Sequence, residues 1–186
     1  MGRLFGAALL AMALLLAGGA GSLAGPSGTS VSPSSGDAGM PAAGRPHPAA
    51  TEAEKALDKL LRLSEKRFGL VAAVLGRPGG GKHDAALARE LTTARLRQGL
   101  AALERNAVRD NCKGRYVPGE ICGLDYNPLT CAQDESDAPY SYRTTAASAE
   151  RADIAYSWPG AANPSARFVM VREAGVWKLD AVQCLP

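Results

Sequence analysis

Apolar side chains recur every three or four residues after Thr51, and charged side chains occupy the opposite face of the implied helix. The apolar positions are Ala53, Ala56, Leu57, Leu60, Leu61 and Phe68. Thr51 and Glu54 have the spacing of a capping box, in which each side chain accepts from the other residue's backbone amide. The pattern predicts a helix that begins at Thr51 and ends near Gly69. The apolar run over 70–75 fits either a further helical turn or a buried strand.

A second apolar stripe runs through Leu87 and Leu91 and resumes at Leu96, after a step that breaks the phase of an α-helix. Thr92 or Thr93 can cap a new helix at this point. The sequence therefore predicts a short helix near 84–91 and a longer one over about 93–108.

Beyond Pro139 the apolar period shortens to two residues. Ala152, Ile154 and Tyr156 point one way and Asp153 the other, which predicts a half-buried strand. Further strands are predicted over 140–147, 168–173 and 176–179. Helices followed by strands are typical of an α+β fold, in this case with the N-terminal helices packed on one face of a curved antiparallel sheet.

The first fifty residues differ in composition from the rest of the chain. Residues 1–24 have the layout of a signal peptide, with Arg3 before an apolar run of about 14 residues, short of the roughly 20 that span a bilayer. Cleavage is favoured, and an uncleaved anchor stays open as the alternative. Residues 25–50 are rich in Gly, Pro, Ser and Ala and predict a disordered linker. Residues 51–186 then form a single domain, periplasmic or secreted, with no membrane contact after signal cleavage.

Four cysteines follow the linker: Cys112, Cys122, Cys131 and Cys184. An even number in an exported chain predicts two disulfides, and the sequence permits three pairings. Bridges from Cys122 to Cys131 and from Cys112 to Cys184 are favoured, because the first closes a short loop and the second ties the last strand to the helical half. A zinc site is disfavoured, since the spacings are not those of a zinc knuckle and no His lies near.

The stretch from Gly76 to Lys82 matches the spacing G-x-x-x-x-G-K of a phosphate-binding loop. His83 stands where a Ser or Thr hydroxyl would hold Mg²⁺, and the predicted sheet is antiparallel. We therefore expect a flexible glycine-rich connection, and no cofactor is predicted.

The net charge of +3 is spread without a basic stripe, which argues against nucleic-acid binding. Residues 111–138 carry two Lys or Arg against five Asp or Glu. No calcium loop is predicted there, because Asp125 and Asn127 run into Pro128 without the required Gly and distal Glu. The acidic loop is instead a candidate docking surface for a basic partner. Its candidate residues are Asp125, Gln133, Asp134, Glu135 and Asp137.

Catalysis by a nucleophile and base is not expected, because the two histidines, His47 and His83, lie in the linker and the glycine-rich connection. A curved sheet closed by helices can form a pocket at its mouth. Candidate lining residues are Tyr140, Tyr142, Asp153 and Tyr156. The alternative is that the tyrosines fill the core, with their hydroxyls at its rim.

Two segments, 124–134 (LDYNPLTCAQD) and 175–184 (GVWKLDAVQC), resemble a bacterial family of exported domains of unknown function. The resemblance covers about 51–186 and implies a cystatin-like or nuclear-transport-factor-like cone, without catalytic residues to carry over. The expected function is that of a non-enzymatic protein-binding domain, of inhibitor or immunity type. The alternatives are a small-ligand-binding or enzymatic cone-fold protein and a structural envelope component.

Overall fold

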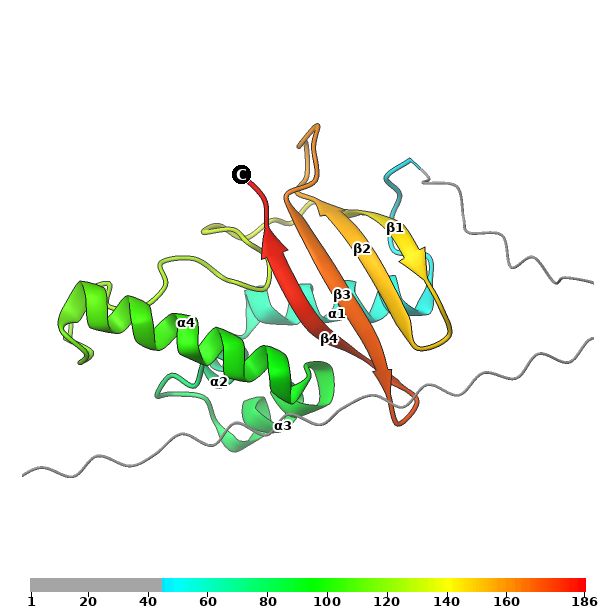
Figure 1. Cartoon of the computed structure of the whole chain (residues 1–186). Coiled ribbons are helices and arrows are strands. Elements are labelled where there is room, and N and C mark those ends of the chain that lie inside the picture. The colour runs from blue at the N-terminus through cyan, green and yellow to red at the C-terminus, as the bar shows by residue number, and fades with distance from the viewer. Residues whose placement is uncertain (1–44) are drawn as a thin grey trace, which may run out of the picture. The chain divides into compact units, whose positions relative to one another are not determined.

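The computed structural model describes residues 45–186, which fold as helices followed by an antiparallel sheet (Figure 1). The predicted α+β class is therefore confirmed. The predicted signal peptide, and the predicted linker up to residue 44, lie outside the described residues. No helix within 45–186 is both long and apolar enough to cross a bilayer.

The first helical pair is α1 (Glu52–Lys66) and α2 (Phe68–Leu75). Thr51 caps α1 as predicted, since its hydroxyl accepts from the Glu54 amide at 3.1 Å and Glu54 accepts from the Thr51 amide at 3.0 Å. The helix ends at Lys66, before the predicted Gly69, and the run over 70–75 is helical. This break rotates Phe68 out of the apolar stripe, and its side chain is 81% exposed.

The second pair is α3 (Lys82–Leu91) and α4 (Ala94–Cys112). Thr93 lies between them and caps α4 by accepting from the Leu96 amide at 3.2 Å. The Thr93 amide also donates to the carbonyl of Leu179 at 2.9 Å, and its hydroxyl donates to Asp180 at 2.8 Å. The start of α4 is thereby attached to the sheet.

Within the described chain the sheet contains β1 (Ser141–Ala147), β2 (Arg151–Ser157), β3 (Ala166–Glu173) and β4 (Val176–Cys184). Their order is β1-β2-β3-β4, an antiparallel meander that does not close on itself. The register shifts by one residue where Val169 faces Ala181 and Met170 faces Leu179. The extra residue is Asp180, and this bulge supplies the carboxylate that binds Thr93.

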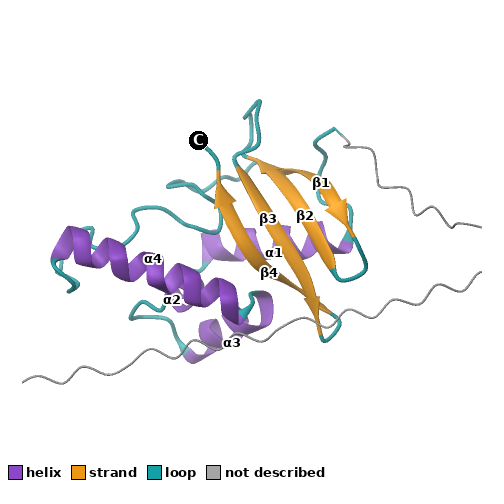
Figure 2. Ribbon diagram, in the orientation of Figure 1, coloured by secondary structure: helices purple, strands orange, loops and turns teal. Residues whose placement is uncertain are grey.

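One face of the sheet packs on α1, which runs behind it in Figure 1. The alternation of the strands sends large buried side chains to this face, including Tyr142, Ile154, Tyr156, Phe168 and Leu179. None of the described helices lies over the near face in Figure 2. His47, which the sequence placed in the linker, pairs with Tyr142 at the edge of β1 through backbone bonds of 2.9 and 2.7 Å.

Candidate functional site

The two disulfides join Cys112 to Cys122 and Cys131 to Cys184, so the favoured pairing was wrong although two bridges were predicted correctly. The reason is the attachment of α4. Its first turn is held beside Asp180, and at 1.5 Å per residue the 19-residue helix carries Cys112 roughly 28 Å away. Cys184 lies only four residues beyond Asp180 and cannot reach that far.

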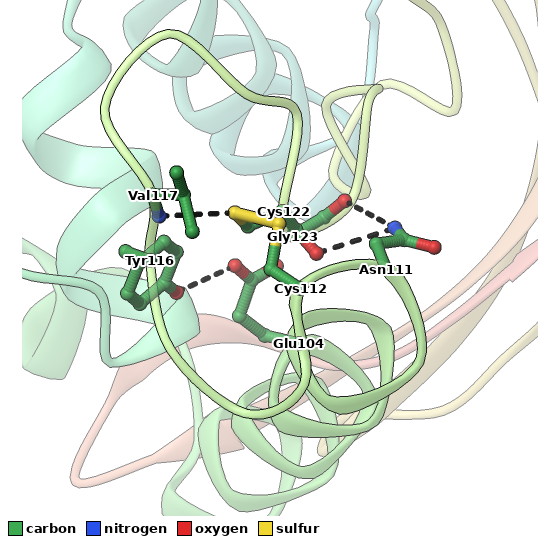
Figure 3. The surroundings of a disulfide bond; sticks show 7 residues. All are labelled: Glu104, Asn111, Cys112, Tyr116, Val117, Cys122 and Gly123. Atoms are coloured by element: carbon green, nitrogen blue, oxygen red, sulfur yellow. Dashed lines mark hydrogen bonds between the residues drawn. A yellow bond between two sulfur atoms is a disulfide. The ribbon is translucent and has the colours of Figure 1, made fainter.

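Residues 113–138 form a loop between α4 and the sheet, which we call the cystine segment. Its first turn begins at Lys113, whose φ of 53° reverses the chain after α4 and returns it to Cys122. Figure 3 shows this return, with the Asn111 amide donating to the carbonyls of Cys122 and Gly123 at 3.2 and 3.4 Å. The short bridge and these bonds hold the cystine segment against the end of α4.

Glu104 of α4 is the main internal anchor of the cystine segment. Its carboxylate is 2% exposed and accepts two bonds of 2.7 Å from the Arg77 guanidinium. It also accepts from the Tyr116 hydroxyl at 2.7 Å and from the Leu124 amide at 3.0 Å. Burial raises the pKa of Glu104, but the bonds from Arg77, Leu124 and Tyr116 outweigh burial and leave the pKa below its ordinary value.

Arg77 explains what the glycine-rich connection does in this fold. A phosphate-binding loop follows a strand, whereas this connection follows α2 and begins at Gly76 in the left-handed conformation. The next residue is Arg77, whose guanidinium reaches Glu104 and also donates to the Leu124 carbonyl at 2.8 Å. The connection thus positions a cation for an internal carboxylate.

A second anchor holds the end of the cystine segment on α1. Glu65 accepts from the Ser136 amide at 3.2 Å and from the Tyr140 hydroxyl. Arg62 donates to the carbonyls of Ser136 and Ala138 at 2.6 and 2.8 Å, and its guanidinium stacks 3.7 Å from the centre of the Tyr140 ring. Both ends of the segment are therefore fixed on helices by charged, largely buried groups.

Between these anchors lies a cleft of about 300 Å³, bounded by α1, α2 and the cystine segment, which we call the acidic cleft. Its apolar lining includes Phe68, Val71, Ile121 and Leu124, and its polar lining includes Asp125, Gln133, Asp134 and Glu135. Phe68 is 81% and Ile121 71% exposed, although both are large apolar side chains. The cleft can therefore offer exposed apolar contacts next to negative charge.

The structure brings four of the five candidate docking residues to one cleft. Gln133 donates to Asp125 at 3.2 Å across the cystine segment, and Asp134 and Glu135 continue the same wall. Asp137 lies instead in an adjoining hollow lined by Arg62, Lys66 and Glu135. Sequence reasoning missed the contribution of Phe68, because it placed this side chain on the buried stripe.

The structure packs three of the four candidate pocket residues together in the core and places the fourth, Asp153, elsewhere. Tyr140, Tyr142 and Tyr156 are at most 2% exposed and lie in the core, with Tyr142 donating to Asp58 of α1 at 2.8 Å. Burial raises the pKa of all three phenols. Asp153 points to the opposite face of the sheet, where it binds Arg151 at 2.9 Å. The alternation of β2 separates Asp153 from Tyr156 by the thickness of the sheet.

The buried carboxylates of the domain are occupied by internal donors. Glu54, for example, accepts from the Ala50 and Thr51 amides and from the Thr144 hydroxyl at 2.7 Å. Within residues 45–186, no three His, Cys, Asp or Glu side chains are grouped closely enough to hold a metal ion.

The chain was compared with models of protein families, with curated proteins and with solved structures, and no match was found. The resemblance of 124–134 and 175–184 to an exported family stays a prediction. So does the cystatin-like cone that this resemblance implies.

Proposed function

We propose that the domain is an exported protein-binding domain that holds a segment of its partner in the acidic cleft. The observation that carries this proposal is the exposure of Phe68 and Ile121 on the two sides of the cleft. Large apolar side chains grouped on a surface are typical of interaction sites, because covering them removes apolar area from water.

The charges around the cleft favour a particular chemistry in the partner. Asp125, Asp134 and Glu135 line the cleft, and Arg77, the one guanidinium that the described residues contribute to its lining, is already bound to Glu104. A partner segment with an apolar side chain beside Lys or Arg would match both features. An inhibitor or immunity protein uses such a rigid, preformed surface, and the two disulfides support both rigidity and export to an oxidising compartment.

Affinity capture with three forms of the full chain tests the proposal. The wild type is compared with the double variant Phe68→Ser, Ile121→Ser and with the control Val176→Ser. Val176 is also an exposed apolar residue, at 44%, but it lies at the β3–β4 turn and does not line the cleft. The extract is kept oxidising so that both bridges persist.

We expect the wild type and the control to retain the same partner and the double variant to lose it, because buried aromatic and aliphatic anchors dominate interface energies. Release of the partner should become easier as salt rises, since the carboxylates act through exposed charge. A partner retained equally by all three forms, or no partner at all, would contradict the proposal.

A further inference from the structure

The face of the sheet turned away from α1 contains a hollow of about 520 Å³, which we call the sheet hollow. Its floor is made of small or short side chains, among them Ala155, Val169 and Ala181. The polar groups that line it are Arg143, Thr145, Arg151, Asp153, Arg167 and Gln183. Within the described part of the chain, the hollow therefore combines a shallow apolar floor with three guanidinium groups and one carboxylate.

Two of these arginines are aligned across the strands. Arg143 faces Ala155, and Ala155 in turn faces Arg167, so the two arginines lie two strands apart in one row. Neighbouring strands are about 4.8 Å apart, which places the two backbones about 10 Å from each other. Ala155 between them is too short to fill the gap, so their guanidinium groups can both reach an anion above it.

No carboxylate of the described residues neutralises the charge of Arg143 or Arg167. Within residues 45–186, neither Arg143 nor Arg167 takes part in an ion pair, whereas Arg151 is bound to Asp153 at 2.9 Å. The Nε of Arg143 is buried and lacks a hydrogen-bond partner among the described residues. A buried donor without an acceptor costs free energy, so no group of the described fold holds this guanidinium in place.

We propose that the sheet hollow binds a small organic phosphate monoester, with its phosphate between Arg143 and Arg167. A phosphate monoester carries close to two negative charges and three strong acceptor oxygens, which suits two guanidinium forks. A carboxylate has only two oxygens, and both are used when it binds one guanidinium group through two parallel hydrogen bonds. The carbon part of the ligand packs on Ala155, Val169 and Ala181. This site is separate from the acidic cleft and does not depend on the function proposed for it.

Titration calorimetry of the full chain with glycerol 1-phosphate tests the proposal, with glycerol as the uncharged comparison. Arg143→Gln and Arg167→Gln should each weaken binding by about tenfold or more, as expected for a lost charge-assisted contact. Asp153→Asn should strengthen binding, because it removes the carboxylate that lines the hollow. The control is Arg89→Gln, which makes the same change of charge on exposed α3 and should leave binding unchanged.

A second measurement locates the ligand without any variant. Glycerol 1-phosphate should shift the NMR signals of Ala155 and Ala181 and leave those of Ile121 and Leu124 in the acidic cleft unmoved. Absence of binding, equal loss in the Arg89→Gln control, or shifts confined to other surfaces would overturn the proposal. So would binding to vesicles that contain phosphatidic acid without binding of the free monoester, because the site would then be a membrane contact.

Discussion

The acidic cleft and the sheet hollow use charged side chains in opposite ways. Next to the cleft, the buried carboxylate of Glu104 accepts hydrogen bonds from Arg77, Tyr116 and Leu124, and it holds the cystine segment in place. In the hollow Arg143 and Arg167 stay without carboxylate partners in the described part of the chain. The charge of Glu104 therefore maintains the fold, whereas the charges of Arg143 and Arg167 remain available to a ligand.

Removing each disulfide in turn should give the largest effects and should distinguish the acidic cleft from the sheet hollow. Cys131→Ser with Cys184→Ser opens a loop of 53 residues and should lower the free energy of unfolding by about 4 kcal/mol in the chain-entropy model. Cys112→Ser with Cys122→Ser opens a loop of 10 residues and should cost about 3 kcal/mol. Urea unfolding measures both values.

The bridges should also differ in their effects on binding. Loss of the short bridge frees Ile121 and should weaken capture by the acidic cleft while phosphate binding persists. Loss of the long bridge releases Cys184, whose neighbour Gln183 lines the sheet hollow, and also Cys131 in the cystine segment. Both partner capture and phosphate binding should therefore weaken. If both double variants changed partner capture and phosphate binding to the same extent, the two surfaces would not be independent.

Removing the carboxylate of Glu104 should have the next largest effect. Glu104→Ala leaves Arg77 without its carboxylate partner and the Leu124 amide without its acceptor, and should destabilise the protein by about 3 kcal/mol. Glu120→Ala makes the same change of charge at an exposed position of the cystine segment and should stay within about 0.5 kcal/mol of wild type. Urea midpoints that do not distinguish the two variants would show that Glu104 is not an anchor.

Gly123 gives a smaller and purely steric test of the same anchor. A Cβ at this position would lie 1.9 Å from the Glu104 Oε1, so Gly123→Ala should cost about 1–3 kcal/mol. The matched control is Gly99→Ala in α4, where an added Cβ would meet no atom within 4 Å outside the nearby backbone of its own helix. That change should stabilise the helix by up to about 1 kcal/mol. The midpoint temperature of thermal unfolding should therefore rise for Gly99→Ala and fall for Gly123→Ala.

Lowering the pH should weaken the stabilisation that the Glu104 carboxylate provides. The pKa of Glu104 lies below its ordinary value of 4.5 in the folded protein. Its ionised form therefore stabilises the fold above pH 4.5, and this contribution is lost as the pH falls through the lower, folded value. The stability difference between wild type and Glu104→Gln should shrink from pH 7 to pH 3 in urea titrations. A difference that stays constant with pH would refute a role for the charge.

The smallest effect on stability is expected in the sheet hollow. Arg167→Gln removes an exposed cation without an ion-pair partner in the described chain, and should change the unfolding free energy by less than about 0.5 kcal/mol. Thermal unfolding in phosphate-free buffer measures this change. A loss comparable to that of Glu104→Ala would mean that Arg167 supports the fold, and the contrast between the two regions would disappear.

Much of the secondary structure could be predicted because its signals are local. Thr51 and Thr93 mark helix starts through hydroxyls that reach amides three residues away, and the change of apolar period after Pro139 marks the strands. The end of α1 was less predictable, because Phe68 continues the apolar spacing although the helix stops before it. An exposed aromatic residue in phase with a buried stripe cannot be recognised from spacing alone.

The sequence by itself determined the α+β class, the presence of two bridges and the acidity of the cystine segment. Only the tertiary structure decided which cysteines pair, because the direction of α4 depends on the contact of Thr93 with the Asp180 bulge. It also decided that Arg77 reaches Glu104, 27 residues along the chain, and that Arg143 and Arg167 share a row. These arrangements depend on strand register and helix packing, which join residues distant in sequence and leave no local pattern.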